Sequence, residues 1–234
     1  MSRRLLVLFV CCLSGSSFAQ FTEQQVWVET GLKVSLSKKF STGIDLTQRY
    51  AYNGLSTVFP QLSIKYKPLK WLKPSVDYRL IGSKELNGIY TLSHRINGNI
   101  QIDQPIKRFQ AGIRVRYQYS FNRLGGQYDA EFDQAWRIKP SVQYDIKGSA
   151  LSPLMSAEFF YNPSNSASGH KFTRIRYYAG LSYSVNKHAF GIGAFCDQWL
   201  NSIPRVRIMY NFTYAYSLTM KKKEEPRVKN PRDL

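Results

Sequence analysis

Long hydrophobic runs are absent from this 234-residue sequence, which has no stretch of 18 consecutive apolar residues. That absence excludes a protein that crosses a membrane with ordinary apolar helices. Acidic residues are also few: 15 Asp and Glu oppose 33 Lys and Arg, which leaves a formal net charge of +18. Such a basic balance first suggests a nucleic-acid partner. Aromatic residues make up 15% of the chain, too many for a disordered basic tail.

Cysteine and histidine are scarce as well, with three of each. Cys11 and Cys12 lie in an amino-terminal segment that we expect to be removed, so Cys196 stands alone and no intrachain disulfide is possible. Three scattered histidines and one cysteine do not have the spacing of a metal site, and no glycine-rich phosphate loop is present. We therefore expect neither a metal nor another cofactor.

Residues 1–19 have the three parts of a secretory signal peptide. Arg3 and Arg4 form the basic start, residues 5–13 are apolar, and small residues occupy both positions of a cleavage site after Ala19. A short buried helix is the alternative interpretation. Secretion argues against a nucleic-acid partner. A secreted chain of this size without disulfides is more typical of a bacterial envelope than of a small extracellular domain.

The chain after the signal repeats one pattern, in which apolar and polar residues alternate between turns. In the first segment Val26, Val28 and Leu32 share one face, and Glu29 and Lys33 share the other. Side chains of a strand alternate in this way. Eleven segments follow the pattern: 24–36, 40–50, 58–66, 72–82, 89–103, 109–121, 130–145, 154–162, 172–185, 188–198 and 204–219. Asp, Glu, Lys and Arg are absent from the apolar face of all eleven.

These segments favour a membrane barrel over a soluble sandwich. A sandwich also alternates, but it packs its apolar faces together, and its strands usually have roughly five or six residues. Most segments here reach the length of about 9–11 residues that a tilted strand needs to cross a bilayer. We predict an all-β fold, a transmembrane antiparallel up-and-down β-barrel of 10–12 strands over residues 20–219. Bacterial barrels usually have an even strand number, so eleven segments leave the parity open.

The connections between segments indicate an orientation. They are mostly short after odd-numbered segments, and outer-membrane barrels have short periplasmic turns. Eight basic residues and no acid fall in the short turns, and they predict a basic periplasmic rim that contacts anionic headgroups or an acidic partner: Lys38, Lys39, Lys67, Lys70, Lys107, Arg108, Lys147 and Lys187. Residues 220–234 are charged and lack the period, which predicts a disordered basic periplasmic tail.

The polar faces of the segments would line the lumen. Fourteen basic and nine acidic residues fall on them, with Glu131, Asp133 and Asp145 among the acids. The candidate ionic network consists of Glu29, Lys33, Asp77, Arg79, Arg114, Arg116, Glu158, Arg174 and Arg176. Paired ions that plug the lumen are one interpretation, because a narrow barrel is filled by side chains and buried ions persist only when paired. The basic excess favours the other interpretation, a narrow pore for anions.

Several short motifs occur in order along residues 24–218. They are Gln25-x-Trp27-x-Glu29, Lys38-Lys39-Phe40, Lys70-Trp71-Leu72-Lys73, Tyr78-Arg79, Arg114-x-Arg116-Tyr117-Gln118, Ser156-x-Glu158-x-Phe160-x-Asn162, Arg174-x-Arg176-Tyr177-x-x-Gly180-Leu181 and Asn186-Lys187-His188. In this the sequence resembles a family of outer-membrane β-barrel proteins of Bacteroidota-type bacteria that is known only as a domain of unknown function. The resemblance implies a location and an architecture, and it implies no particular chemistry.

These observations predict a structural or interaction protein in the outer membrane of a Gram-negative bacterium. Its partners would be outer-membrane lipids, the assembly machinery during insertion and an envelope protein that the sequence does not identify. The alternatives are the narrow anion-favouring pore and a lipid-acting outer-membrane enzyme. Ser93 and His94 are the candidates for an enzyme, but the alternation places them on opposite faces of one segment, where they do not readily pair. We therefore expect no catalytic site.

Overall fold

A computed structural model of the chain describes residues 21–85, 88–121, 134–165, 169–200 and 205–220. The predicted signal peptide and the predicted tail after Met220 lie outside these residues. Eleven strands occupy the described part: β1 (Phe21–Ser35), β2 (Phe40–Ala51), β3 (Gly54–Tyr66), β4 (Leu72–Lys84), β5 (Tyr90–Ile106), β6 (Phe109–Phe121), β7 (Gln134–Tyr144), β8 (Leu151–Asn162), β9 (Lys171–Val185), β10 (His188–Trp199) and β11 (Arg205–Thr219). No helix among these residues is long and apolar enough to cross a membrane.

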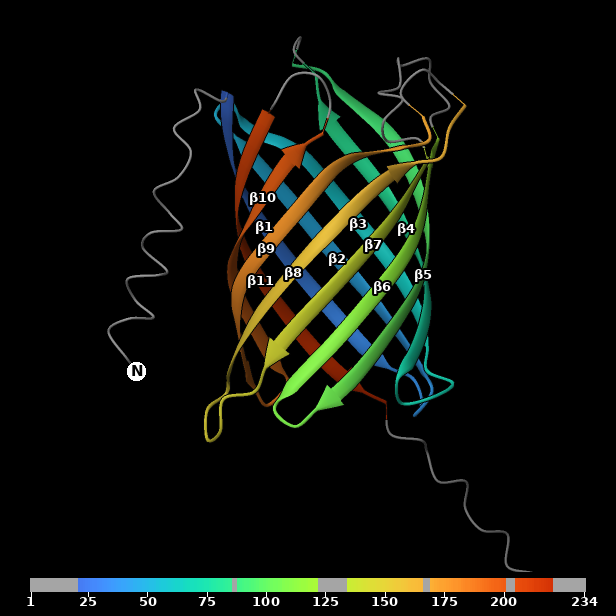
Figure 1. Cartoon of the computed structure of the whole chain (residues 1–234), viewed down its shortest axis with the longest axis vertical. Coiled ribbons are helices and arrows are strands. Elements are labelled where there is room, and N and C mark those ends of the chain that lie inside the picture. The colour runs from blue at the N-terminus through green and yellow to red at the C-terminus, as the bar shows by residue number, and fades with distance from the viewer. Residues whose placement is uncertain (1–20, 86–87, 122–133, 166–168, 201–204, 221–234) are drawn as a thin grey trace, which may run out of the picture.

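The eleven strands close into one barrel (Figure 1). Each strand pairs antiparallel with its neighbours in sequence, and β1 pairs with β11 in parallel, in a register that runs from Phe21 opposite Arg205 to Ser35 opposite Thr219. The all-β barrel prediction is confirmed, and eleven strands fall within the predicted range. The one difference is the parallel seam, which follows from the odd number: strands that alternate in direction leave the first and the eleventh pointing the same way.

The seam also settles the parity that the sequence leaves open. β1 begins and β11 ends at opposite ends of the barrel (Figure 1). The turns β1–β2, β3–β4, β5–β6, β7–β8 and β9–β10 all lie at the end where β11 finishes, which we call the turn end. The β2–β3 turn and the start of β1 lie at the opposite end, which we call the loop end. The first strand therefore starts at the loop end, and the eleven segments contain no miscount.

The outer wall of the barrel is apolar. Its side chains stand well exposed, as for Ile44 at 57%, Val76 at 58% and Ile192 at 53%. Apart from residues at strand ends such as Lys84 and Lys171, the charged residues of the described strands all face inward, in the alternation that the registers give. This wall is the inverse of a soluble protein surface, because its exposed face is apolar and its enclosed face is charged.

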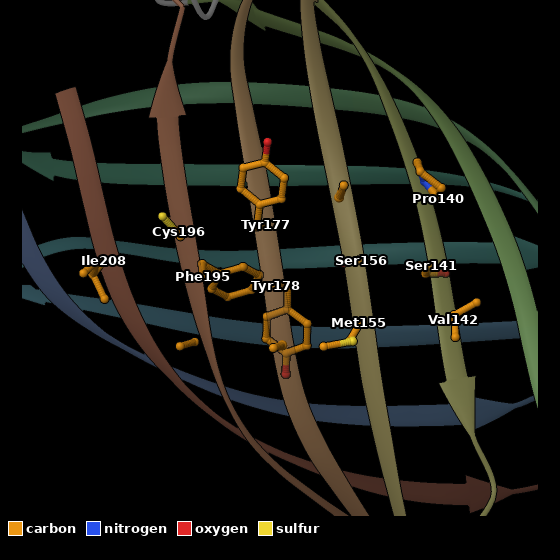
Figure 2. Close-up of a pocket in the computed structure, with 13 residues that line it drawn as sticks. Pro140, Ser141, Val142, Met155, Ser156, Tyr177, Tyr178, Phe195, Cys196 and Ile208 are labelled. Carbon is orange, nitrogen blue, oxygen red and sulfur yellow. The ribbon is translucent and has the colours of Figure 1, made fainter. Parts of the chain in front are cut away.

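The outer wall carries a shallow apolar groove of about 720 Å³ across β7–β11 (Figure 2). Small outward residues form its floor: Ala194 lies opposite Ala179, and Ala179 lies opposite Met155. Pro140, Tyr177 and Ile208 stand around it (Figure 2). The groove is lined mainly by apolar atoms and therefore continues the apolar wall.

Candidate functional site in the charged lumen

The lumen contains two cavities along the barrel axis. The loop-side chamber has a volume of about 440 Å³ and reaches toward the loop end with Thr57, Ser83 and Arg207. The turn-side chamber has a volume of about 500 Å³ and reaches toward the turn end with Ser35, Ser41 and Lys67. Three residues line both chambers, Gln61, Arg114 and Arg116. These shared side chains mark the layer at which the two chambers meet.

Ion pairs occupy this middle layer. Arg116 Nη2 lies 3.0 Å from Asp77 Oδ2, and Asn99 donates a hydrogen bond of 2.9 Å to the same oxygen. Glu158 binds two arginines, with Arg114 Nη2 at 2.6 Å from Oε1 and Arg137 Nη2 at 2.8 Å from Oε2. Asp77 and Glu158 are nearly inaccessible to solvent, at 4% and 3% exposure. The layer joins β4 to β8 across the inside of the wall.

Further ion pairs stand on both sides of the middle layer. Asp197, which is fully buried, binds Arg174 at 3.1 Å and Arg176 at 2.5 Å. Toward the loop end Glu23 binds Arg205 at 2.9 Å and Arg207 at 2.7 Å, so that β1 and β11 are tied across the parallel seam. On the turn side Lys73 binds Asp103 at 2.6 Å. Much of the lumenal charge is therefore paired between neighbouring strands.

Two arginines of the loop-side chamber have no carboxylate partner among the described residues. Arg49 Cζ lies 3.9 Å from the centre of the Trp27 ring and 4.7 Å from that of Phe59. Arg79 Cζ lies 4.2 Å from the Phe59 centre, and its Nε donates a hydrogen bond of 3.0 Å to the neutral Gln61. Arg176 completes the group, 4.9 Å from the Trp27 centre. We call these five residues the arginine–aromatic cluster: Trp27, Arg49, Phe59, Arg79 and Arg176.

The candidate ionic network from the sequence divides into separate groups. Its ion-paired members are Asp77 with Arg116, Glu158 with Arg114, and Arg174 and Arg176 with Asp197. Three members form no ion pair in the described part of the chain. Glu29 accepts a hydrogen bond of 2.9 Å from Asn211, Arg79 binds Gln61, and Lys33 lines the turn-side chamber.

Sequence reasoning missed several members of the site. Arg137 and Asp197 fall on the polar faces of their segments and are absent from the candidate network, although they complete two of its groups. Glu23 lies on the same face of the first strand as Glu29, and extending the alternation to this position would have identified it as a lumenal residue. Trp27 shares the polar face of the first segment, so its aromatic ring in the lumen was visible in the pattern and its cation contact was not. Glu131 and Asp133 lie outside the described residues.

The structure brings the eight residues of the basic rim to the turn end of the barrel. All eight are exposed and lie in the turns between β1 and β2, β3 and β4, β5 and β6, β7 and β8, and β9 and β10. One expectation about this region is wrong. Asp145 does not face the lumen from a strand: β7 ends at Tyr144, and Asp145 is exposed in the same connection as Lys147. The connection that contains Lys147 therefore also contains an acid, because the seventh strand ends one residue before the alternation does.

Ser93 and His94 lie on opposite faces of β5. Ser93 pairs with Ile81, which lines the loop-side chamber. His94 points outward, where its Nδ1 is 2.7 Å from Tyr78 Oη and its ring stacks on Phe121 at a centroid distance of 5.2 Å. The Ser93 hydroxyl and the His94 ring therefore do not face one another. The described residues include no group of three or more His, Cys, Asp and Glu side chains that could hold a metal ion. The lumen offers ion pairs and, at Arg49 and Arg79, guanidinium groups without a carboxylate partner among the described residues.

Comparisons with known proteins add a family. A family model described as "Protein of unknown function (DUF2490)" matches residues 24–207, from the first strand to the start of the eleventh. No curated protein matches the sequence.

The middle layer generates a stability prediction. Replacing Glu158 with Gln leaves Arg114 and Arg137 without their shared carboxylate, and breaking a buried ion pair on one side costs about 3–5 kcal/mol. Urea unfolding in detergent micelles, followed by tryptophan fluorescence, measures the loss. Glu29→Gln is the matched control, because a glutamine oxygen can still accept the Asn211 hydrogen bond, and its cost should stay below about 1 kcal/mol. Equal losses in the two variants would contradict the ion-pair explanation.

Proposed function

We propose that this chain, which belongs to the DUF2490 family of proteins of unknown function, is an integral outer-membrane β-barrel of a Gram-negative bacterium with a structural or interaction role in the envelope. The observation that carries the proposal is the outer wall, whose exposed side chains are apolar while the lumen holds the charges. An apolar wall of this kind is unfavourable in water, because moving one methylene group out of water contributes about 0.8 kcal/mol of stabilisation. The hydrocarbon core of a bilayer is apolar like the outer wall and would cover it without this cost.

The backbone supports the same proposal. In a bilayer every backbone polar group needs an internal partner, and closed barrels meet this requirement because they have no edge strand. The β1–β11 seam closes the sheet, so no strand is left with an open edge. The strands have 11–17 residues, and a tilted strand needs about 9–11 to cross the hydrocarbon core. The strands are therefore long enough to span the membrane.

The basic rim supports an orientation and a contact. Short turns face the periplasm in outer-membrane barrels, so the turn end and its eight cations would face the periplasm. A cation near an anionic lipid surface contributes about 1 kcal/mol, and the contribution falls off within a Debye length. We assign the rim to anionic headgroups or to an acidic envelope protein. The interaction role of the barrel would then lie at its turn end.

The lumen supports a second candidate function, a narrow pore that favours anions. Ten basic side chains and only two carboxylates, Glu29 and Glu158, line the loop-side chamber. The ion pairs of Asp77 and Glu158 lie where the two chambers meet, so a solute would have to pass them. The basic excess favours anions, and the ion-paired layer makes any passage narrow.

The location of the protein is directly testable. We expect the expressed protein to sediment with the outer membrane, and we expect its gel mobility to change on heating, because a closed barrel resists detergent until it is boiled. Fractionation and gel electrophoresis of heated and unheated samples measure both. Recovery of the chain in the soluble periplasmic fraction would refute the membrane assignment.

The orientation requires a separate experiment. In a Cys196→Ala background, single cysteines replace Lys38 at the turn end or Asn53 at the loop end, and both positions are exposed. A maleimide that does not cross the outer membrane should label Asn53→Cys in intact cells and Lys38→Cys only after lysis. The reverse pattern would place the basic rim outside the cell.

Conductance separates the structural barrel from the pore. Purified, folded protein in a planar bilayer should show no stepwise current if the ion-paired layer closes the lumen. The test variant is Glu158→Gln, which removes a carboxylate of the middle layer. Its control is Glu29→Gln, which removes a lumenal carboxylate outside that layer. Stepwise currents in the wild type with a reversal potential that favours chloride over potassium would establish the pore and replace the structural role.

A further inference from the structure

We propose that the loop-side chamber is a binding site for a small oxyanion, a phosphate or carboxylate group, which Arg49 and Arg79 hold against Trp27 and Phe59. The proposal concerns the lumen alone. It goes beyond a structural role in the envelope, and it does not depend on whether the barrel conducts ions or which end faces the periplasm.

Arg49 is the main evidence, because it is enclosed and lacks an acceptor. Its guanidinium lies between the Trp27 and Phe59 rings, and its buried Nε has no hydrogen-bond partner among the described residues. A buried donor without an acceptor costs about 1–3 kcal/mol, so native structures rarely leave one unmatched. The aromatic contacts fix the plane of the guanidinium, and they do not satisfy its donors. Arg49 lines the chamber, so an anion bound there would provide the counterion that the described residues do not give this guanidinium.

Arg79 also contacts Phe59, and it forms no ion pair among the described residues. Its Nε and Nη2 both donate to Gln61 Oε1, at 3.0 and 2.5 Å, which orients the guanidinium without neutralising its charge. Arg49 and Arg79 contact the same Phe59 ring, at 4.7 and 4.2 Å from its centre. The two guanidinium groups repel each other, and an anion bound beside them would reduce this repulsion. The fork of a guanidinium matches the paired oxygens of phosphate and carboxylate.

The charge balance of the chamber points the same way. Its ten basic side chains face Glu29 and Glu158 inside the chamber, and Glu23, Asp77 and Asp197 pair with lining arginines from its edges. Among the described residues, basic side chains therefore outnumber carboxylates at this chamber. Glu29 forms a hydrogen bond with Asn211 and no direct ion pair with an arginine of the cluster among the described residues. Charges in a low-dielectric interior interact strongly, which favours a bound anion over open solvent.

The supporting residues hold the site in a binding-ready form. Arg176, which contacts Trp27 from the side of β9, is fixed by two hydrogen bonds to Asp197 at 2.5 and 2.8 Å. The arginines of the cluster come from β2, β4 and β9, so the closed wall sets their spacing. A volume of about 440 Å³ lies in the usual range of small-molecule sites, roughly 300–1,000 Å³. The chamber is therefore large enough for a small phosphorylated or carboxylated solute.

The test is a calorimetric titration of the full-length mature protein, folded in detergent micelles, with inorganic phosphate at constant ionic strength. We expect saturable binding that acetate also shows and that an equal excess of chloride does not abolish. Arg49→Gln should weaken phosphate binding about tenfold or more, since a hydrogen bond to a charged group is worth about that factor. Arg49→Lys keeps the charge and loses the fork, and it should bind phosphate more weakly than the wild type.

Lys65→Gln is the matched control, because it removes one lumenal cation from the turn-side chamber, which Arg49 does not line. It should change phosphate affinity less than about twofold. Heat-modifiable mobility shows that each variant is folded, and Arg49→Lys keeps the test decisive if Arg49→Gln does not fold. Short-chain phosphatidylglycerol in a parallel titration distinguishes a lipid headgroup from a free phosphate as the source of the group. Absence of saturable phosphate binding, or equal weakening by Arg49→Gln and Lys65→Gln, would overturn the proposal, and neither result would bear on the membrane location.

Discussion

The parallel pairing of β1 with β11 is the constraint on which the rest of the structure depends. It closes eleven strands into a barrel, and closure decides which face of every strand is inside. A one-residue slip in this register would turn the inward set of β1, including Glu29 and Lys33, toward the outside. The ion pairs of Glu23 with Arg205 and Arg207 cross the seam directly, so the same register that hides the charges also pairs them. Closure of the barrel therefore produces the apolar outer wall and the charged lumen, and it brings the ion-pair partners of the seam together.

The lumen shows how a narrow barrel accommodates many charges. Desolvation is expensive for each ion, and a carboxylate shared by two arginines, as in Glu158 and Asp197, satisfies two cations with one anion. Few carboxylates remain among the described residues to pair with the other lumenal cations. Arg49 and Arg79 rest on aromatic rings instead, where the electron-rich faces stabilise a cation by roughly 0.5–2 kcal/mol. That is less than a counterion provides, and the difference is the basis for an anion site in the loop-side chamber.

The basic residues of the connections gather at one end of the barrel. The five connections at the turn end lie together with the finish of β11. Eight exposed Lys and Arg residues lie in those turns, with Asp145 as an acid in the same region. The strongly basic composition of the chain therefore does not describe a uniform surface. It divides into an apolar wall without charge, a lumen in which most charges are paired, and one positive end.

The strands, their faces and the turns can be predicted from the order of residues alone, because side chains of a strand alternate between its two faces. Strand β6, expected at 109–121, lies at Phe109–Phe121, and β7 ends at Tyr144, one residue before the expected end, because its pairing with β6 stops there. Only the tertiary structure decided the seam, the partners of each ion and the position of Arg49 between Trp27 and Phe59. Those features join residues far apart in sequence, such as Glu23 and Arg207, and their pairing depends on the curvature and register of the closed sheet, which no local pattern encodes.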